Sequence, residues 1–383
     1  MKKATFILTF LLISVYANAQ IIYETFQSVK LNDTRDIKIQ LPRGYYNNMD
    51  KSYPVCVVLD GDYLFEAVAG NVDYFSYWED MPDAIVIGIN QAEKRFEDCY
   101  YSKENAFPAD KGAAFFEFLG MELMPFIDKN YRTQDFRVAF GHGLTANFIN
   151  YYLLKPQSLF HAYVVMSPEL APEMASYIPE RLSNIDTKIF YYLATSDQDV
   201  NFIKEGTKAL QKNMAAIENQ NLLFEYDEFK DATHYALPTH AIPNALESIF
   251  FVYQPISKKE FNDVIVQLQS SPVDYLTEKY TTIKELFGIE KPILINDFKA
   301  IAASIERNGT FEYYEALGKL ARKEYPDTLL GNYYLARFYE ENNDPKKAMK
   351  TYRSAYILQE TAGLTKDMML EKAESIKADF GYN

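Results

Sequence analysis

The strongest candidate for chemistry is a glycine-rich turn in the middle of the chain. The apolar run Arg137–Phe140 leads into a turn at 141–143, and a helical pattern begins at Leu144. A strand that turns sharply into a helix is the setting of a nucleophile elbow, where a serine or similar side chain is held against a base. The turn contains a histidine but neither serine nor cysteine, so the surrounding elements must show whether it belongs to a reaction site.

Those elements follow an alternating pattern up to about Tyr253. Strands are expected at Ile37–Leu41, Pro54–Leu59, Ala84–Ile89, Arg137–Phe140, Ala162–Met166, Lys188–Leu193 and Leu222–Phe229. Helices are expected at Gly112–Asn130, Leu144–Leu154 and Asn201–Glu218. Strand–helix alternation with continuous apolar strands predicts an α/β fold, in which a parallel sheet has helices on both faces. Functional residues of such sheets gather at the carboxyl ends of the strands.

This first part of the chain resembles the putative-esterase, or esterase D-like, branch of the α/β-hydrolase superfamily. The matching segments are Arg35–Pro42, Leu59–Phe65, Arg95–Asp98, the helix Gly112–Asp128, Ser167–Pro168, and His234 with Pro238 and the helix Ala245–Phe251. The resemblance implies an α/β-hydrolase fold. It also implies hydrolysis of carboxylic esters by a serine, a histidine and an acid.

The chain departs from the family at the turn. Family enzymes have Gly-His-Ser-x-Gly, whereas residues 141–145 read Gly-His-Gly-Leu-Thr. The resemblance therefore places Gly143 at the nucleophile position, where glycine cannot form an acyl-enzyme. Glycine adopts unusual backbone angles without steric cost, so the turn can persist without its chemistry. Thr145 replaces the second family glycine, and its side chain is expected to crowd the contact between helix and strand.

The resemblance places the other triad members after later strands. The acid belongs within Thr195–Asp199, where Asp197 is preferred to Asp199, although either carboxylate could be solvated or cap the next helix. His234 occupies the position of the base. Asp197 and His234 are therefore candidate triad remnants, and the pair could also survive as a structural relic or a ligand contact. The other histidines are expected to have structural, packing or surface roles: His142, His161 and His240.

A ligand pocket could survive the loss of the serine. Backbone N–H groups for an oxyanion are expected from Leu144 and from the loop around Gly61 and Asp62, so a carbonyl or carboxylate could still bind. Aromatic residues between Tyr63 and Trp78 could stack on a sugar or acyl ligand, or pack in the core. The sequence has no glycine-rich phosphate loop, no cysteine pair at metal spacing and no H-E-x-x-H, so no cofactor or metal is expected.

The remainder, from Lys258 to the end, has a helical and acidic pattern. Two helical patterns flank the turn Asn343-Asp344-Pro345, with packing positions at Leu335, Ala336, Tyr339, Ala348, Tyr352 and Ala355. The spacing is typical of a 34-residue tetratricopeptide unit, and an ordinary helical hairpin fits it equally well. Such helices would dock on the first domain or on a protein partner.

The amino terminus has the three parts of a secretory signal. Lys2 and Lys3 precede the apolar run Phe6–Val15, and Ala17 and Ala19 form a cleavage pattern. We therefore expect a periplasmic or secreted protein with a signal peptide at 1–19, a hydrolase domain at 20–255 and a helical domain at 256–383. The net charge of −14 disfavours nucleic acid, and no later segment is apolar enough for a transmembrane span.

The sequence thus predicts a catalytically degenerate esterase relative that binds a small ester, a carbohydrate-like ligand or a protein. One alternative is an active carboxylic-ester hydrolase on an acylated sugar or other small ester, which would use another nucleophile such as a water aligned by His234. The other alternative is a scaffold that binds partners through its helical tail. Cys56 and Cys99 are too few for a disulfide framework and are expected to be free thiols.

Overall fold

The computed structural model describes residues 21–382, so the predicted signal peptide lies outside the described residues. The described chain divides into two compact units. The first comprises residues 21–74 and Asp83–Leu246, and the second comprises Phe75–Pro82 and residues 247–382. The sequence predicted that the second domain begins at residue 256. The main segment of the second unit begins nine residues earlier, at residue 247.

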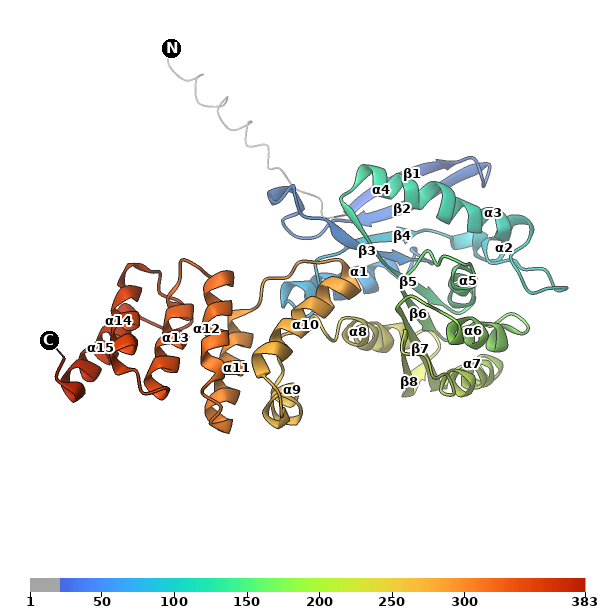
Figure 1. The fold of residues 1–383 in the computed structure, drawn as a ribbon. Coiled ribbons are helices and arrows are strands. Elements are labelled where there is room, and N and C mark those ends of the chain that lie inside the picture. The colour runs from blue at the N-terminus through green and yellow to red at the C-terminus, as the bar shows by residue number, and fades with distance from the viewer. Residues whose placement is uncertain (1–20, 383) are drawn as a thin grey trace, which may run out of the picture. The chain divides into compact units, whose positions relative to one another are not determined.

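The first unit is built on one eight-stranded sheet (Figure 1). Its strands are β1 (Ile21–Ser28), β2 (Asp33–Gln40), β3 (Tyr53–Val58), β4 (Ile85–Ile89), β5 (Thr133–His142), β6 (Ala162–Met166), β7 (Ile189–Gln198) and β8 (Leu222–Thr233). The order across the sheet is β1-β2-β4-β3-β5-β6-β7-β8. From β4 to β8 all neighbours are parallel, whereas β2 pairs antiparallel with both β1 and β4. The predicted α/β-hydrolase fold, with a mostly parallel sheet, is confirmed.

Helices cover both faces of this sheet. They are α1 (Phe65–Tyr77), α2 (Arg95–Asp98), α3 (Asp110–Phe118), α4 (Met124–Asn130), α5 (Leu144–Leu153), α6 (Met174–Ser183), α7 (Asn201–Met214) and α8 (Leu237–Ile249). In Figure 1, α1 and α8 lie on one face, and α5, α6 and α7 lie on the other. The helix expected at 112–130 is real but contains a π-helical turn at Leu119–Leu123, which separates α3 from α4.

Successive side chains of the central strands point to opposite faces and all are buried, which explains why both faces need covering. On β3, Val55 and Val57 belong to the large core cluster shared with α3 and α5, while Cys56 and Val58 alternate with them and are equally buried. Gly88 of β4 lies on the opposite face, where α1 packs so closely that a side chain at this position would collide with Phe65. Both cysteines, Cys56 and Cys99, are buried free thiols.

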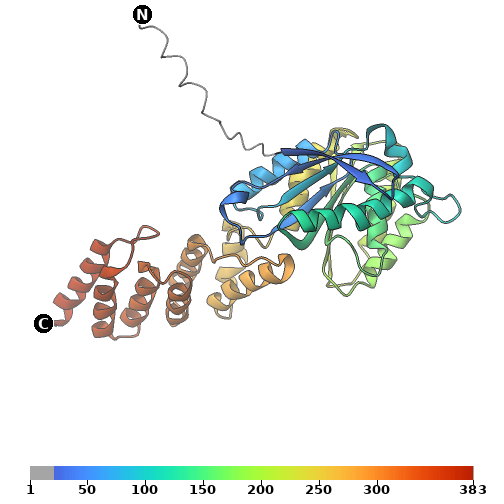
Figure 2. The same ribbon diagram turned by 90° about the horizontal axis from the view of Figure 1, so that it is seen from above.

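The second unit is helical, as expected (Figure 2). Its helices are α9 (Lys258–Asp263), α10 (Pro272–Phe287), α11 (Ile295–Asn308), α12 (Tyr313–Glu324), α13 (Leu329–Glu341), α14 (Pro345–Ser354) and α15 (Lys366–Phe380). The predicted turn joins α13 to α14, and the Asp344 side chain accepts a hydrogen bond from the Lys347 N–H at the start of α14. A tetratricopeptide relationship stays a prediction. Among residues 21–382, every helix is too short or too polar to cross a bilayer.

Candidate functional site

The elbow lies at the centre of the sheet, where β5 passes into α5. Gly143 has φ 62° and ψ −118°, a region that side chains rarely allow. Its N–H donates to the Met166 carbonyl at 3.0 Å, and its carbonyl accepts from the Glu169 N–H at 3.0 Å. Gly141 permits the close approach of α5, since a Cβ there would lie 2.7 Å from Ala146 Cα. The predicted strand–turn–helix is therefore present around Gly143.

His234 and Asp199 form a hydrogen-bonded pair at the same edge of the sheet. His234 Nδ1 lies 2.8 Å from Asp199 Oδ1. Asp199 also accepts from the Val200 N–H at 2.8 Å and from the Thr195 hydroxyl at 3.2 Å, and the Ser167 hydroxyl donates to it as well. Burial alone would raise the pKa of Asp199, but the bonds from His234, Ser167 and Val200 outweigh it and lower that pKa. The carboxylate therefore stays ionised beside the imidazole.

The preference for Asp197 over Asp199 is corrected by this geometry. Strand β7 continues to Gln198 instead of ending at Leu193, so Asp197 still lies within the strand. Its exposed carboxylate accepts the N–H of Asp231 at 2.8 Å. Asp199 is the first residue beyond β7 and is the acid that reaches His234.

His234 faces the position where residue 143 would carry a side chain. A Cβ built on Gly143 would lie 3.6 Å from His234 Nε2 and 3.8 Å from its Cε1. Because Asp199 engages Nδ1, Nε2 is the nitrogen available for proton exchange at this point. The geometry is that of an acid–base pair directed at the open position beside Gly143.

Arg95 and Asp60 form the other wall of this position, and the sequence analysis assigned neither a role. Arg95, the first residue of α2, lies with Nη2 3.3 Å from the same Cβ point. Its Nε and Nη2 donate to Asp60 at 2.6 and 3.1 Å, and Nη2 also donates to the His142 carbonyl at 2.8 Å. The only sequence signals were the two family-like segments that contain them, Leu59–Phe65 and Arg95–Asp98.

Thr145 fits the turn instead of crowding it. Its hydroxyl donates to Asp60 Oδ2 at 2.7 Å and accepts the His142 N–H at 2.9 Å. The residue is fully buried. The expected steric conflict is therefore wrong, because two hydrogen bonds tie the hydroxyl between the elbow and the end of β3.

The predicted oxyanion donors differ in their availability. Leu144 is the first residue of α5, where helix N–H groups have no partner within the helix. The Gly61 N–H instead donates to the Ile89 carbonyl at 2.8 Å, so this donor is already used. Asp62 accepts the N–H groups of Gln91 and Ala92 through its carboxylate, at 2.7 and 2.8 Å. Gly61 is therefore not available as an oxyanion donor, whereas the roles of the Leu144 and Asp62 N–H groups stay predictions.

His142 packs beneath the pair and is held neutral. Its Nε2 lies 3.0 Å from the His234 carbonyl, and its Nδ1 lies 3.0 Å from the Tyr63 hydroxyl. Burial, with His234 and Arg95 nearby, lowers the pKa of His142 to about 3. A neutral ring must donate from Nε2, because a carbonyl only accepts. These contacts suit the structural role expected for His142.

The other two histidines lie away from this cluster. His161 immediately precedes β6, at the amino end of the strand, and stacks on Phe136. His240 is an exposed residue of α8 near Phe229. Within residues 21–382, no group of three or more histidine, cysteine or acidic side chains is arranged to hold a metal ion.

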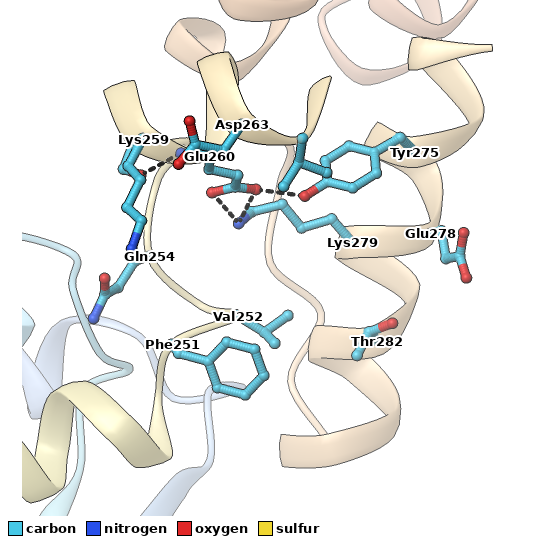
Figure 3. A pocket seen from close by; sticks show the side chains of 12 residues that line it. Phe251, Val252, Gln254, Lys259, Glu260, Asp263, Tyr275, Glu278, Lys279 and Thr282 are labelled. Carbon is cyan, nitrogen blue, oxygen red and sulfur yellow. Dashed lines mark hydrogen bonds and ion pairs between the residues drawn. The ribbon is translucent and has the colours of Figure 1, made fainter. Parts of the chain in front are cut away.

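The helical unit has a concave region of its own (Figure 3). A cavity of about 800 Å³ lies between α9, α10 and the segment that precedes α9. Lys279 lies 3.1 Å from Glu260 in its wall, and the Tyr275 hydroxyl donates to the same carboxylate at 2.8 Å. Phe251 and Val252 supply apolar lining. The three polar groups satisfy one another, and nothing in the wall identifies a ligand.

Comparisons with known proteins identify solved structures that share this fold. An uncharacterised protein from Capnocytophaga ochracea is 30% identical, with a TM-score of 0.84, over 94% of this chain and all of that chain. An IroE-like serine hydrolase from Shewanella oneidensis shares the fold at 19% identity and a TM-score of 0.60, over 79% of this chain and 99% of that one. The BES protein of Bacillus cereus has a TM-score of 0.52 at 22% identity, over 64% of this chain and 97% of that one.

None of the curated proteins matches the chain. The profile described as Putative esterase matches residues 28–233, more than half of the sequence, including every strand from β2 to β8 and the elbow. The chain therefore belongs to the Putative esterase family of α/β-hydrolase folds.

Proposed function

We propose that this protein is a catalytically degenerate member of its family, which binds a small acyl ligand at the elbow without forming an acyl-enzyme. The observation that carries the proposal is the position of Gly143. Gly143 has no side chain, and a Cβ built on it would lie 3.6 Å from His234 Nε2 and 3.3 Å from Arg95 Nη2. The groups that serve a nucleophile surround the point, and the nucleophile itself is missing.

Neighbouring hydroxyl groups do not supply a substitute nucleophile. The Thr145 hydroxyl is engaged with Asp60 and the His142 N–H, on the side of β3. The Ser167 hydroxyl donates to Asp199, which lies behind the imidazole on its Nδ1 side. Neither oxygen is paired with His234 Nε2, so neither has a base to accept its proton. This argues against the alternative of an active esterase that uses a displaced serine or threonine.

Restoring the nucleophile tests the proposal. Gly143→Ser should place a hydroxyl beside His234 Nε2 and the Leu144 N–H, and we expect hydrolysis of p-nitrophenyl acetate to rise about 100-fold or more above the parent. The added change His234→Ala should abolish the gain. Recovery is expected to be partial, since a site without catalytic selection has no reason to keep an open acyl pocket.

Two results would contradict the proposal. One is covalent labelling of the unmodified protein by a fluorophosphonate at Thr145 or Ser167, which would reveal a working nucleophile. The other is a folded Gly143→Ser protein with no gain in hydrolysis, which would mean that Asp199 and His234 do not converge on residue 143 as a triad requires. Circular dichroism establishes folding for each variant.

A further inference from the structure

A further cavity lies in the sheet unit, at the opposite end of the strands from the elbow. Its volume is about 670 Å³, and its wall is formed at the amino ends of β5, β6 and β7 and by the segments that follow α5 and α6. Arg137 in the wall precedes His142 by five residues along β5, which separates the cavity from the elbow by about 16 Å. A ligand in this cavity would therefore bind apart from the candidate active site.

Arg181 of α6 brings a positive charge to this wall. Its Nε donates to the Leu153 carbonyl at 3.1 Å, and its Nη2 donates to the carbonyls of Lys155 and Pro156 at 3.0 and 2.9 Å. These acceptors are neutral, and within residues 21–382 no carboxylate forms an ion pair with this arginine. The N–H groups of its Nη1 have no acceptor in the same part of the chain. A guanidinium fixed in this way, with donors left over, suits a ligand carboxylate.

His161 adds a donor of fixed tautomer to the same wall. Its Nδ1 accepts the backbone N–H of Arg137 at 3.4 Å. Burial and the nearby Arg137 lower the pKa of His161. A neutral ring that accepts at Nδ1 carries its hydrogen on Nε2. Among the described residues this N–H has no acceptor, so it can donate to a carbonyl group of a ligand.

Two carboxylates in the wall restrict the kind of ligand. Asp135 and Asp186 line the cavity, are exposed, and form no ion pair within residues 21–382. Arg137 already has a partner, because its Nη2 lies 2.7 Å from Asp128. The wall thus has one unpaired cation, Arg181, and two unpaired carboxylates. These carboxylates would repel a ligand that is only anionic, whereas a ligand with a carboxylate and an ammonium group matches both signs of charge.

The size and lining of the cavity favour a short peptide over a single amino acid. A volume of about 670 Å³ lies within the range of about 300–1,000 Å³ that is typical of small-molecule sites. Pro156 and Leu159 supply apolar surface for a side chain. A peptide also has a backbone carbonyl that can accept the N–H of His161, which a single amino acid lacks.

We propose that this cavity binds a short peptide with free amino and carboxyl termini. The carboxylate binds at Arg181, the ammonium group binds at Asp135 or Asp186, and a backbone carbonyl accepts from His161. No covalent bond forms or breaks. The site does not depend on the proposed function of the elbow.

Calorimetric titration of the full chain with glycyl-leucine tests the proposal. N-acetyl-glycyl-leucine lacks the ammonium group, and glycyl-leucinamide lacks the carboxylate. Each analogue should bind at least about tenfold more weakly than glycyl-leucine, because each leaves one charge of the wall unmatched. No binding of glycyl-leucine, or equal affinity for either analogue, would overturn the proposal.

Variants locate the site. Asp135→Asn,Asp186→Asn should weaken glycyl-leucine binding at least about tenfold and should not weaken binding of the acetylated peptide. Glu104→Gln,Glu205→Gln removes the same charge at exposed residues outside the cavity and should leave the affinity unchanged. Arg181→Gln should also weaken binding about tenfold. If its lost carbonyl contacts prevent folding, the aspartate variant decides, and unchanged affinity in that variant contradicts the proposal.

The elbow provides a separate control. Gly143→Ser should leave the affinity for glycyl-leucine unchanged, because the two places lie at opposite ends of β5. Loss of peptide binding in folded Gly143→Ser would place the peptide at the elbow and overturn the proposal. Absence of hydrolysis in that variant would bear only on the proposed function.

Discussion

Each unit of the molecule contains a largely buried ion pair with a tyrosine attached to it, and the two pairs differ in one respect. In the sheet unit, Asp60 is 2% exposed and joins Arg95, with Tyr63 as a further donor. In the helical unit, Glu260 and Lys279 are 20% and 7% exposed, and Tyr275 donates to the same carboxylate. The sheet pair borders a position that lacks a side chain, whereas the helical pair is complete in itself.

This difference indicates which of the two units is the better place to look for a reaction site. Buried charges occur in both units, so burial and pairing alone do not mark a reaction site. In the sheet unit, Arg95 borders the same open point as His234, which comes from a distant part of the chain. In the helical unit, the partners lie on the neighbouring helices α9 and α10, so the pair is explained by packing.

The largest effect should come from removing Asp60. Asp60→Ala leaves Arg95 without its carboxylate and removes an acceptor of Thr145 and Tyr63, so we expect the free energy of unfolding to fall by about 3–5 kcal/mol. Urea unfolding followed by circular dichroism measures this loss.

Glu260→Ala is the matched change in the helical unit. Glu260 is more exposed, so its removal should cost about 1–2 kcal/mol. Trp78 is the single tryptophan of the chain and belongs to the second unit, so its fluorescence follows this transition. An equal or larger loss for Glu260→Ala would break the contrast between the two pairs.

The next prediction concerns which aspartate, Asp199 or Asp197, acts with His234. In the Gly143→Ser background, Asp199→Asn should lower the recovered hydrolysis about 100-fold, because His234 loses the carboxylate that orients it and stabilises its protonated form. Asp197→Asn should change the rate by less than about twofold. The reverse order of the two effects on p-nitrophenyl acetate hydrolysis would restore Asp197 as the acid.

A pH dependence of stability due to His142 is also expected. Its pKa is lowered to about 3 in the folded protein, against an ordinary value of about 6.5 when unfolded. The unfolded chain therefore takes up the proton first, and the stability that His142 contributes is complete above about pH 6.5 and is lost as the pH falls toward 3. Urea unfolding should show a loss of about 2 kcal/mol from this residue between pH 7.5 and pH 5.

Histidine variants isolate that contribution. His161 also has a lowered pKa and adds a slope of the same sign, so the wild-type curve alone does not assign the effect. His142→Gln should flatten the curve between pH 7.5 and pH 5, and His240→Gln should leave it unchanged. A curve that His142→Gln does not alter would show that His142 is not held neutral by the fold.

Much of the fold could be predicted from the sequence because buried parallel strands leave a clear pattern. Strand β6 has the bounds expected for it, and β3 and β4 begin and end within one residue of theirs. Strand β1 was missed because it is an edge strand with several exposed residues, so it carries no continuous apolar run. The interruption of the helix at 119–123 was also missed, because the helical pattern of apolar residues continues through it.

The site was only partly predictable, for reasons of register and distance along the chain. The sequence identified Gly143 and His234 but not which aspartate reaches the histidine, since that depends on how far β7 extends. Asp60 and Arg95 are 35 residues apart, and only folding shows that they pair. Thr145 was expected to disturb the turn because the sequence shows the size of its side chain. Its acceptor, Asp60, comes from the loop after β3, and the sequence does not show that the two meet.

The backbone conformation of residue 143 also affects the stability of the folded protein. With φ 62° and ψ −118°, the residue has a backbone conformation that costs a side-chain-bearing residue on the order of 1–3 kcal/mol and costs glycine much less. A serine in this turn would therefore trade thermodynamic stability for reactivity. Glycine at this position avoids that cost, and the hydrogen bonds of Gly143 and Thr145 hold the turn in place. Under the proposed function, glycine at this position therefore favours the stability of the sheet unit over reactivity.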